Sequence, residues 1–144
     1  MSALTPYLCC RDAARAIDFY CQALGAVESM RMAEPDGRIG HAELRIGDDP
    51  IFLSDEYPDH GVQSPASYGG TPVTLHLYVN DADAVVARAA AAGATVERPV
   101  QDQFYGDRTG TLRDPFGHRW MISTRKESLS DDELQRRYRD TVKQ

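Results

Sequence analysis

Two patterns of hydrophobic and polar residues follow one another along this chain, in the same order in each half. Short segments with period-two alternation are typical of strands, and an apolar residue every three or four positions is typical of a helix. Within residues 13–24, Ile17, Tyr20 and Leu24 share one face at helical spacing. Gly25 then provides a residue that tolerates the left-handed conformation of a helix C-cap. The pattern predicts a helix over residues 13–24.

The second half repeats this arrangement at an offset of about 69 residues. Residues 8–13 correspond to residues 77–82, and each copy places an aspartate, Asp12 or Asp81, directly before the predicted helix. An aspartate side chain there can accept hydrogen bonds from the free N–H groups of the first turn. We expect the second helix over residues 82–92, ending at Gly93, with a buried face formed by Val85, Val86 and Ala89.

Three segments with strand character follow each predicted helix. They cover residues 26–32, 40–46 and 51–54 in the first half, and 95–99, 109–113 and 118–123 in the second. Turn-forming residues separate the last two segments of each half, at residues 47–50 and 114–117. The sequence therefore predicts an α+β fold of two tandem βαβββ modules, at residues 4–55 and 71–124, within one domain of residues 1–125.

Two further segments lie outside these modules. Residues 56–70 are rich in Pro, Gly and Ser, and they form a connection long enough to be either a linker or a pocket lid. In the tail, residues 126–144, the stretch from Ser130 to Glu133 is a capping-box pattern. Leu134, Tyr138 and Val142 then recur every four residues. We expect a tail helix that lies on the domain or on a partner chain.

Charge and composition exclude some classes of partner. The formal net charge is −6, and no basic stripe is present to neutralise phosphates, so nucleic acid is not expected as a partner. No apolar run approaches the roughly 20 residues that span a bilayer, so no membrane partner is expected either. Cys9, Cys10 and Cys21 have no metal-finger spacing and are expected to be free thiols, which indicates a cytoplasmic location.

The two modules resemble a known superfamily. Residues 12–25, with the sequence Asp-Ala-Ala-Arg-Ala-Ile-Asp-Phe-Tyr-Cys-Gln-Ala-Leu-Gly, and residues 114–118 resemble the vicinal oxygen chelate superfamily. That superfamily includes glyoxalase I, extradiol dioxygenases, fosfomycin-resistance transferases and bleomycin-binding proteins. Residues 40–48 and 126–137 resemble its small bacterial glyoxalase-like members. The resemblance implies that the strands form curved open sheets around a small-molecule cavity.

The same resemblance indicates where superfamily enzymes bind a divalent metal. Their ligands are His, Glu or Tyr residues on the first and last strand of each module, and these positions fall on Thr5, Leu53, Thr74 and Met121. None of the four supplies an imidazole or a carboxylate. We therefore expect no cofactor and no metal at these positions, although a displaced divalent metal remains an alternative.

Strand alternation indicates which residues face the cavity. Within residues 73–79 the apolar side chains share one face, so Thr74, His76 and Tyr78 point into the concave side. The same reasoning places His41, Glu43 and Arg45 on the polar face of the segment 40–46. The predicted ligand-binding residues on strands are Thr5, Tyr7, Thr74, His76, Tyr78, Arg119 and Met121.

A loop adds three more predicted ligand contacts. Phe104 and Tyr105 are expected at the mouth of the pocket as an aromatic surface, with Arg108 available for a carboxylate or phosphate. The alternative is a buried aromatic anchor with a local salt bridge. Trp120 is expected in the core.

Two functions of different classes agree with these residues. The first is a module that binds a small organic molecule without catalysis. The second is a glyoxalase-like lyase or isomerase in which His41, Glu43 and His76 form a displaced metal site or an acid–base site. Otherwise these three are simply polar residues of the cavity. We also expect a homodimer with shared pockets, since the edges of open sheets are usually covered.

Overall fold

The first module contains a four-stranded sheet and one helix. The structure, a computed structural model, describes residues 3–142. The elements follow in the order β1 (Tyr7–Cys9), α1 (Ala13–Leu24), β2 (Val27–Ala33), β3 (Ile39–Ile46) and β4 (Asp49–Ser54). The strand order in the sheet is β1-β4-β3-β2, with β1 parallel to β4 and the other pairs antiparallel.

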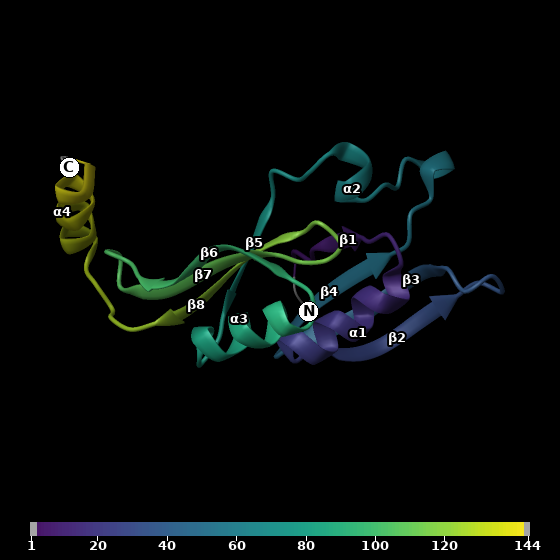
Figure 1. Cartoon of the computed structure of the whole chain (residues 1–144), viewed down its shortest axis with the longest axis horizontal. Helices are drawn as coiled ribbons and strands as arrows, with labels where there is room; N and C mark the ends of the chain where they lie inside the picture. The colour runs from purple at the N-terminus through teal and green to yellow at the C-terminus, as the bar shows by residue number, and fades with distance from the viewer. Residues whose placement is uncertain (1–2, 143–144) are drawn as a thin grey trace.

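The second module has the same topology. After η1 (Pro58–His60) and α2 (Pro65–Tyr68) come β5 (Thr74–Tyr78), α3 (Ala82–Ala91), β6 (Thr95–Asp102), β7 (Asp107–Arg113) and β8 (Arg119–Arg125). The strand order is β5-β8-β7-β6, again with a parallel first pair. Both sheets are open, as Figure 1 shows. The prediction of an α+β fold with two βαβββ modules is confirmed.

The ends of the two helices follow from capping. The Asp12 carboxylate accepts a hydrogen bond from the backbone N–H of Arg15, and Asp81 caps α3 in the same way through Ala84. Gly25 closes α1 with a φ of 70°, in the left-handed region that favours glycine. The helix α3 ends at Ala91, one residue earlier than predicted. No helix within residues 3–142 has the length and apolar character needed to cross a membrane.

One hydrophobic core joins the two modules. Each sheet packs one face against its own helix, and α1 contacts α3 between the sheets, as seen near the centre of Figure 1. The core side chains alternate along the strands with residues that face away from the helices, as period-two patterning requires. They include Leu8, Ala42, Leu44, Ile51, Leu53, Leu112, Trp120 and Ile122. The expected burial of Trp120 is confirmed.

A buried carboxylate connects the modules at this core. Asp114, in the turn between β7 and β8, is 3% exposed. Its Oδ2 accepts hydrogen bonds from the Tyr20 hydroxyl at 2.5 Å and from Trp120 Nε1 at 2.9 Å. Its Oδ1 accepts the backbone N–H groups of Phe116 and His118. Because Tyr20 lies on α1 and Asp114 in the second module, this bond joins the two modules.

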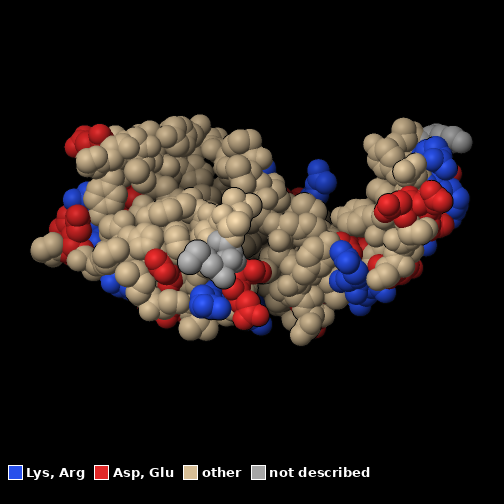
Figure 2. All heavy atoms as spheres, turned by 180° about the vertical axis from the view of Figure 1, so that it is seen from behind, with Lys and Arg blue, Asp and Glu red and all other residues tan. Residues whose placement is uncertain are grey.

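The tail helix α4 (Asp131–Val142) stands apart from both sheets (Figure 1). Its first turn is capped by the Ser130 hydroxyl, which accepts a hydrogen bond from the N–H of Glu133, as the capping-box pattern predicted. Tyr138 is 57% exposed and Val142 64% exposed. Figure 2 shows the opposite face, where charged side chains gather on this arm and a hollow separates it from the rest of the molecule.

We predict that Tyr20→Phe lowers the free energy of unfolding by about 1.5–3 kcal/mol, the usual contribution of a hydrogen bond to a charged group. Burial raises the pKa of the Tyr20 phenol well above its usual value, so this group remains a donor. Urea unfolding measures the loss. Tyr68→Phe is the matched control, because Tyr68 is 66% exposed and its hydroxyl should contribute less than about 0.5 kcal/mol. Equal stabilities of the two variants would contradict the role given to Tyr20.

Candidate functional site

The sheet faces opposite the helices form the candidate site. In the strand registers Tyr7 pairs with Phe52, and His76 pairs with Met121 at the corresponding place in the second module. Leu53 is fully buried on the helix-facing side. The prediction that Leu53 faces the cavity is therefore wrong by one residue, and Phe52 occupies the position. Because strand side chains alternate, a slip of one residue moves a side chain to the other face.

On the concave face of the first module, three polar side chains form a hydrogen-bonded row. The Tyr7 hydroxyl lies 2.6 Å from Nδ1 of His41, and Nε2 of His41 lies 2.9 Å from Oε2 of Glu43. The Phe52 ring packs beside this row, with its centroid 5.0 Å from that of His41. The predicted pair His41 and Glu43 is thus joined by Tyr7, a residue predicted only as a ligand contact.

The corresponding face of the second module has different chemistry. His76 Nε2 lies 2.7 Å from the hydroxyl of the buried Ser123, and the His76 ring stacks on Tyr78. The Tyr78 hydroxyl donates to the carboxylate of Asp107. The other residues predicted here, Thr74, Arg119 and Met121, line a polar cavity of about 440 Å³ together with Glu97, Arg98 and Thr111.

The predicted constellation of His41, Glu43 and His76 does not form within this chain. His41 and Glu43 belong to the first sheet, whereas His76 belongs to the second and is engaged with Ser123. Among residues 3–142, no three His, Cys, Asp or Glu side chains are grouped so that they could hold a metal ion.

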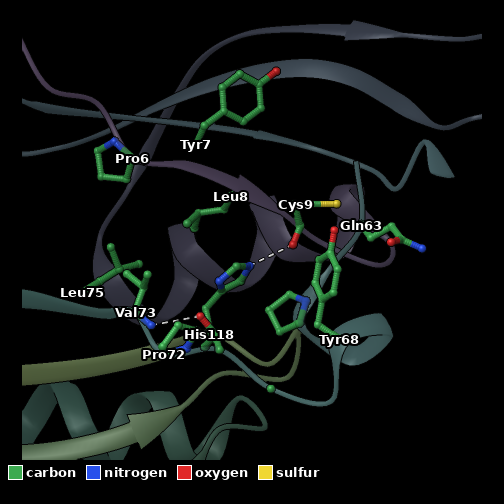
Figure 3. Close-up of a pocket in the computed structure, with 13 residues that line it drawn as sticks. Pro6, Tyr7, Leu8, Cys9, Gln63, Tyr68, Pro72, Val73, Leu75 and His118 are labelled. Carbon is green, nitrogen blue, oxygen red and sulfur yellow. Dashed lines mark hydrogen bonds between the residues drawn. The ribbon is translucent and has the colours of Figure 1, made fainter. Parts of the chain in front are cut away.

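A cavity of about 380 Å³ lies where the two modules meet (Figure 3). Its walls come from β1, from the segment leading into β5, from α2 and its flanking residues, and from the turn before β8. His118 connects two of these walls, since its Nε2–H donates to the carbonyl oxygen of Cys9 at 2.8 Å. The lining residues are Pro6, Tyr7, Leu8, Cys9, Gln63, Pro65, Tyr68, Gly70, Thr71, Pro72, Val73, Leu75 and His118.

A second cavity, of about 670 Å³, lies under the connection between the modules. It shares Tyr7, Cys9 and Gln63 with the first cavity, so these three residues stand at the border between the two. Burial, followed by the charges of Glu56 and Asp55, raises the pKa of the Cys9 thiol to about 11. Cys9 therefore lines both cavities as a neutral thiol and not as a nucleophilic thiolate.

Glu56 holds this connection in place. Its carboxylate accepts hydrogen bonds from the backbone N–H of Ser64, from the hydroxyls of Ser64 and Ser67, and from Nε of Arg11. The Ser64 N–H and the Ser67 hydroxyl contribute most to lowering the pKa of Glu56 to about 2. Gln63 of this connection lines both cavities, and Tyr68 lines the smaller one.

The loop predicted to form an aromatic surface contacts the tail helix instead. The Phe104 ring packs against Tyr105 and against Tyr138 of α4. Arg108 forms salt bridges with Asp83 at 2.7 Å and with Asp102 at 3.1 Å. The local salt bridge of the alternative is present, but Phe104 and Tyr105 are half-buried and not buried. The ligand-binding role of Phe104, Tyr105 and Arg108 stays a prediction.

Sequence reasoning missed three residues that line the cavity between the modules. Gln63 and Tyr68 lie in the connection, for which no contacts were predicted, and His118 was not among the predicted ligand contacts. The signal that could have identified them is the combination of turn residues and polar side chains in a long connection, which is typical of functional loops.

The residues at the superfamily metal positions do not fit a divalent metal. On the corrected register these positions hold Thr5, Phe52, Thr74 and Met121. Two neutral hydroxyls, a phenyl ring and a thioether supply neither a carboxylate nor an imidazole, the donors that hard and borderline divalent ions prefer.

Comparisons with known proteins agree with the fold. The chain is 48% identical over 136 residues to an uncharacterized protein of Mycobacterium bovis, covering 92% of this chain and 90% of that protein. It is 31% identical over 124 residues to an uncharacterized protein of Arabidopsis thaliana, covering 81% and 74% of the two chains. Among solved structures, TioX from Micromonospora superposes with a TM-score of 0.69 at 28% identity, covering 87% of this chain and 99% of TioX.

A family model describes almost all of both modules. It matches residues 3–122, from before β1 into β8. The match covers β1 to β7 and the first part of β8, the helices α1 and α3, and the connection between the modules. This chain belongs to the glyoxalase/bleomycin resistance protein/dioxygenase superfamily.

Proposed function

We propose that this protein binds a small organic molecule in the cavity where its modules meet, next to the concave faces of its sheets. The observation that carries the proposal is the cavity of about 380 Å³ lined by both modules and by the connection between them. Its volume lies within the range of roughly 300–1,000 Å³ that is usual for small-molecule sites. Because the fold hosts many functions, the proposal rests on this site and not on the family alone.

The chemistry of the lining supports an organic ligand with a polar end. Pro6, Pro72, Val73 and Leu75 provide an apolar wall, while Tyr68 and His118 place polar atoms beside it (Figure 3). We propose that the ligand binds without a divalent metal at the superfamily positions. The free thiols Cys9, Cys10 and Cys21 support a reducing, cytoplasmic setting.

A second candidate function is metal-free catalysis by a lyase or isomerase. The observation that favours it is the contact of 2.9 Å between His41 and Glu43, which pairs an imidazole with a carboxylate on the open concave face. Such a pair can act as an acid–base group toward a bound ligand. His76, in contrast, has its Nε2 engaged with Ser123, which weakens its candidacy as the base.

We also propose a homodimer in which a second copy covers the concave faces. The arm formed by α4 extends away from the sheets and exposes Tyr138 and Val142. Exposed apolar side chains also occur on the edge strand β2, at Val27, Met30 and Met32. Natural proteins usually cover the edges of open sheets, and a closed two-fold contact would do so at both copies.

In a thermal-shift screen of small organic molecules, we expect ligands that stabilise the protein, by about 2.7 kcal/mol at a concentration 100 times Kd. Tyr68→Ala should weaken binding of the best ligand at least about tenfold, because it removes an aromatic wall of the cavity. Val96→Ala, which truncates an exposed side chain on β6, is the matched control and should bind normally. Normal binding by Tyr68→Ala would contradict the proposed cavity.

His76→Ala tests whether the concave face of the second module takes part in ligand binding. We expect a changed ligand affinity with nearly unchanged thermal stability, because Ser123 keeps a hydrogen bond to Thr109 when His76 is removed. Melting temperature and affinity are measured on the same sample. A large loss of stability with unchanged affinity would show that His76 is a structural residue.

Elemental analysis of protein purified without added metal tests the proposed absence of a metal. We expect Zn, Ni, Mn and Fe to be well below one equivalent per chain, since Thr5, Phe52, Thr74 and Met121 compete poorly with water for these ions. About one equivalent of metal per chain, with two or more of these side chains as its ligands in a crystal structure, would contradict the proposal.

Sedimentation or light scattering at micromolar concentration tests the dimer. We expect about twice the mass of one chain, which is 16.0 kDa. Val142→Asp should shift the protein toward the monomer, because it places a charge on the exposed apolar side of α4. Thr141→Asp adds the same charge at the neighbouring position and is the control. A wild-type mass near 16.0 kDa would rule out the dimer.

A further inference from the structure

The hydrogen-bonded row on the first module has one order of protons that satisfies both bonds of a neutral His41 beside an ionised Glu43. A carboxylate oxygen of Glu43 accepts, so Nε2 of His41 carries the proton of that bond. In a neutral imidazole the other nitrogen is then an acceptor. Nδ1 of His41 therefore accepts the hydrogen bond that the Tyr7 hydroxyl donates at 2.6 Å. The row runs from phenol to imidazole to carboxylate.

This order leaves the oxygen of Tyr7 free to accept a further proton. Tyr7 is 55% exposed, and its ring points away from the cavity of about 380 Å³ (Figure 3) and lines the larger cavity. His41 is half-buried between Tyr7, Phe52 and Glu43. The Tyr7 and His41 rings also pack around the ring of Phe52, which fixes their relative position. The arrangement has the three parts of an activated group: an exposed hydroxyl, an adjacent base and a third group that orients the base.

We propose that Tyr7 is the ligand-facing end of a metal-free proton relay formed by Tyr7, His41 and Glu43. The oxygen of Tyr7 takes a proton from a hydroxyl of the ligand, or from a carbon next to a ligand carbonyl. At the same time the phenolic proton of Tyr7 passes to Nδ1 of His41. The ligand becomes an anion, His41 becomes an imidazolium paired with Glu43, and the reverse transfer returns the proton. This inference rests on the proposed function, with the ligand extending past β1 into the larger cavity that Tyr7 lines.

One observation supports the direction of this transfer, and another limits the relay to the first module. Burial, followed by the charges of Cys9 and Glu43, raises the pKa of the Tyr7 phenol, so Tyr7 is protonated at rest and needs His41 to accept its proton. In the second module, the strand registers place His76, Thr109 and Thr111 at the positions of Tyr7, His41 and Glu43. That set lacks a carboxylate, so the relay belongs to the first module alone.

Reactivity toward an electrophile tests the relay without knowledge of the ligand. Benzenesulfonyl fluoride forms a bond between its sulfur and a tyrosine oxygen, the sulfur–fluorine bond breaks, and the phenolic proton leaves through the base as fluoride departs. Peptide mass spectrometry then gives the rate at each tyrosine. We expect Tyr7 to react at least about tenfold faster than Tyr68, because an adjacent base activates it. Tyr68 is 66% exposed and is an internal reference in the same molecule.

Matched variants identify the source of this activation. His41→Gln should reduce the rate at Tyr7 to that of Tyr68, and Glu43→Gln should give an intermediate rate. His76→Gln, the same substitution in the second module, should leave the rate at Tyr7 unchanged. Equal rates at Tyr7 and Tyr68 in the wild type, or a fast Tyr7 in His41→Gln, would overturn the relay.

A second measurement uses only the wild-type protein, so it does not depend on whether the variants fold. The ¹⁵N spectrum of the wild-type protein should show His41 protonated on Nε2 and unprotonated on Nδ1, and the opposite tautomer would also overturn the relay.

The thermal-shift screen separates this inference from the proposed function. Ligand binding with an unactivated Tyr7 would refute only the relay, and an activated Tyr7 without any ligand would refute only the proposed site.

Discussion

The hydrogen bond between Tyr20 and Asp114 is the interaction on which the arrangement of the two modules depends. A carboxylate that is 3% exposed is costly to bury unless its oxygens are satisfied, and here four donors satisfy them. Two of these donors are backbone groups of the turn before β8, which fixes the turn itself. The same turn places His118 against β1, where its imidazole binds the carbonyl of Cys9. One buried charge thus sets both the junction of the modules and one wall of the cavity.

A second buried carboxylate plays a similar part within the first module. Asp55, at the end of β4, accepts the backbone N–H groups of Ala13 and Ile39, which joins the start of α1 to the start of β3. The adjacent Glu56 holds the connection that covers the cavities, through Ser64, Ser67 and Arg11. The two neighbouring carboxylates therefore have different roles. Asp55 stabilises the first module, and Glu56 positions the connection between the modules.

The duplicated architecture does not imply duplicated chemistry. Both modules use the same strand order and the same pattern of buried residues, yet their concave faces differ. The first presents Tyr7, His41 and Glu43, and the second presents His76 hydrogen bonded to Ser123. Core positions are constrained by packing on the helices, whereas concave positions are free to vary without loss of the fold. Membership of the superfamily accordingly explains the sheets, whereas the chemistry of the site depends on its own side chains.

The sequence by itself determined the order of elements, because hydrophobic periodicity, aspartate caps and turn residues are local signals that the chain carries in each module. Tertiary structure decided which distant residues meet. It joined Tyr7 to His41, separated His76 from Glu43, paired Arg108 with Asp83, and replaced Leu53 by Phe52 on the concave face. These outcomes depend on strand register and on contacts between residues far apart in the chain, and a shift of one residue in register reverses the face of every side chain.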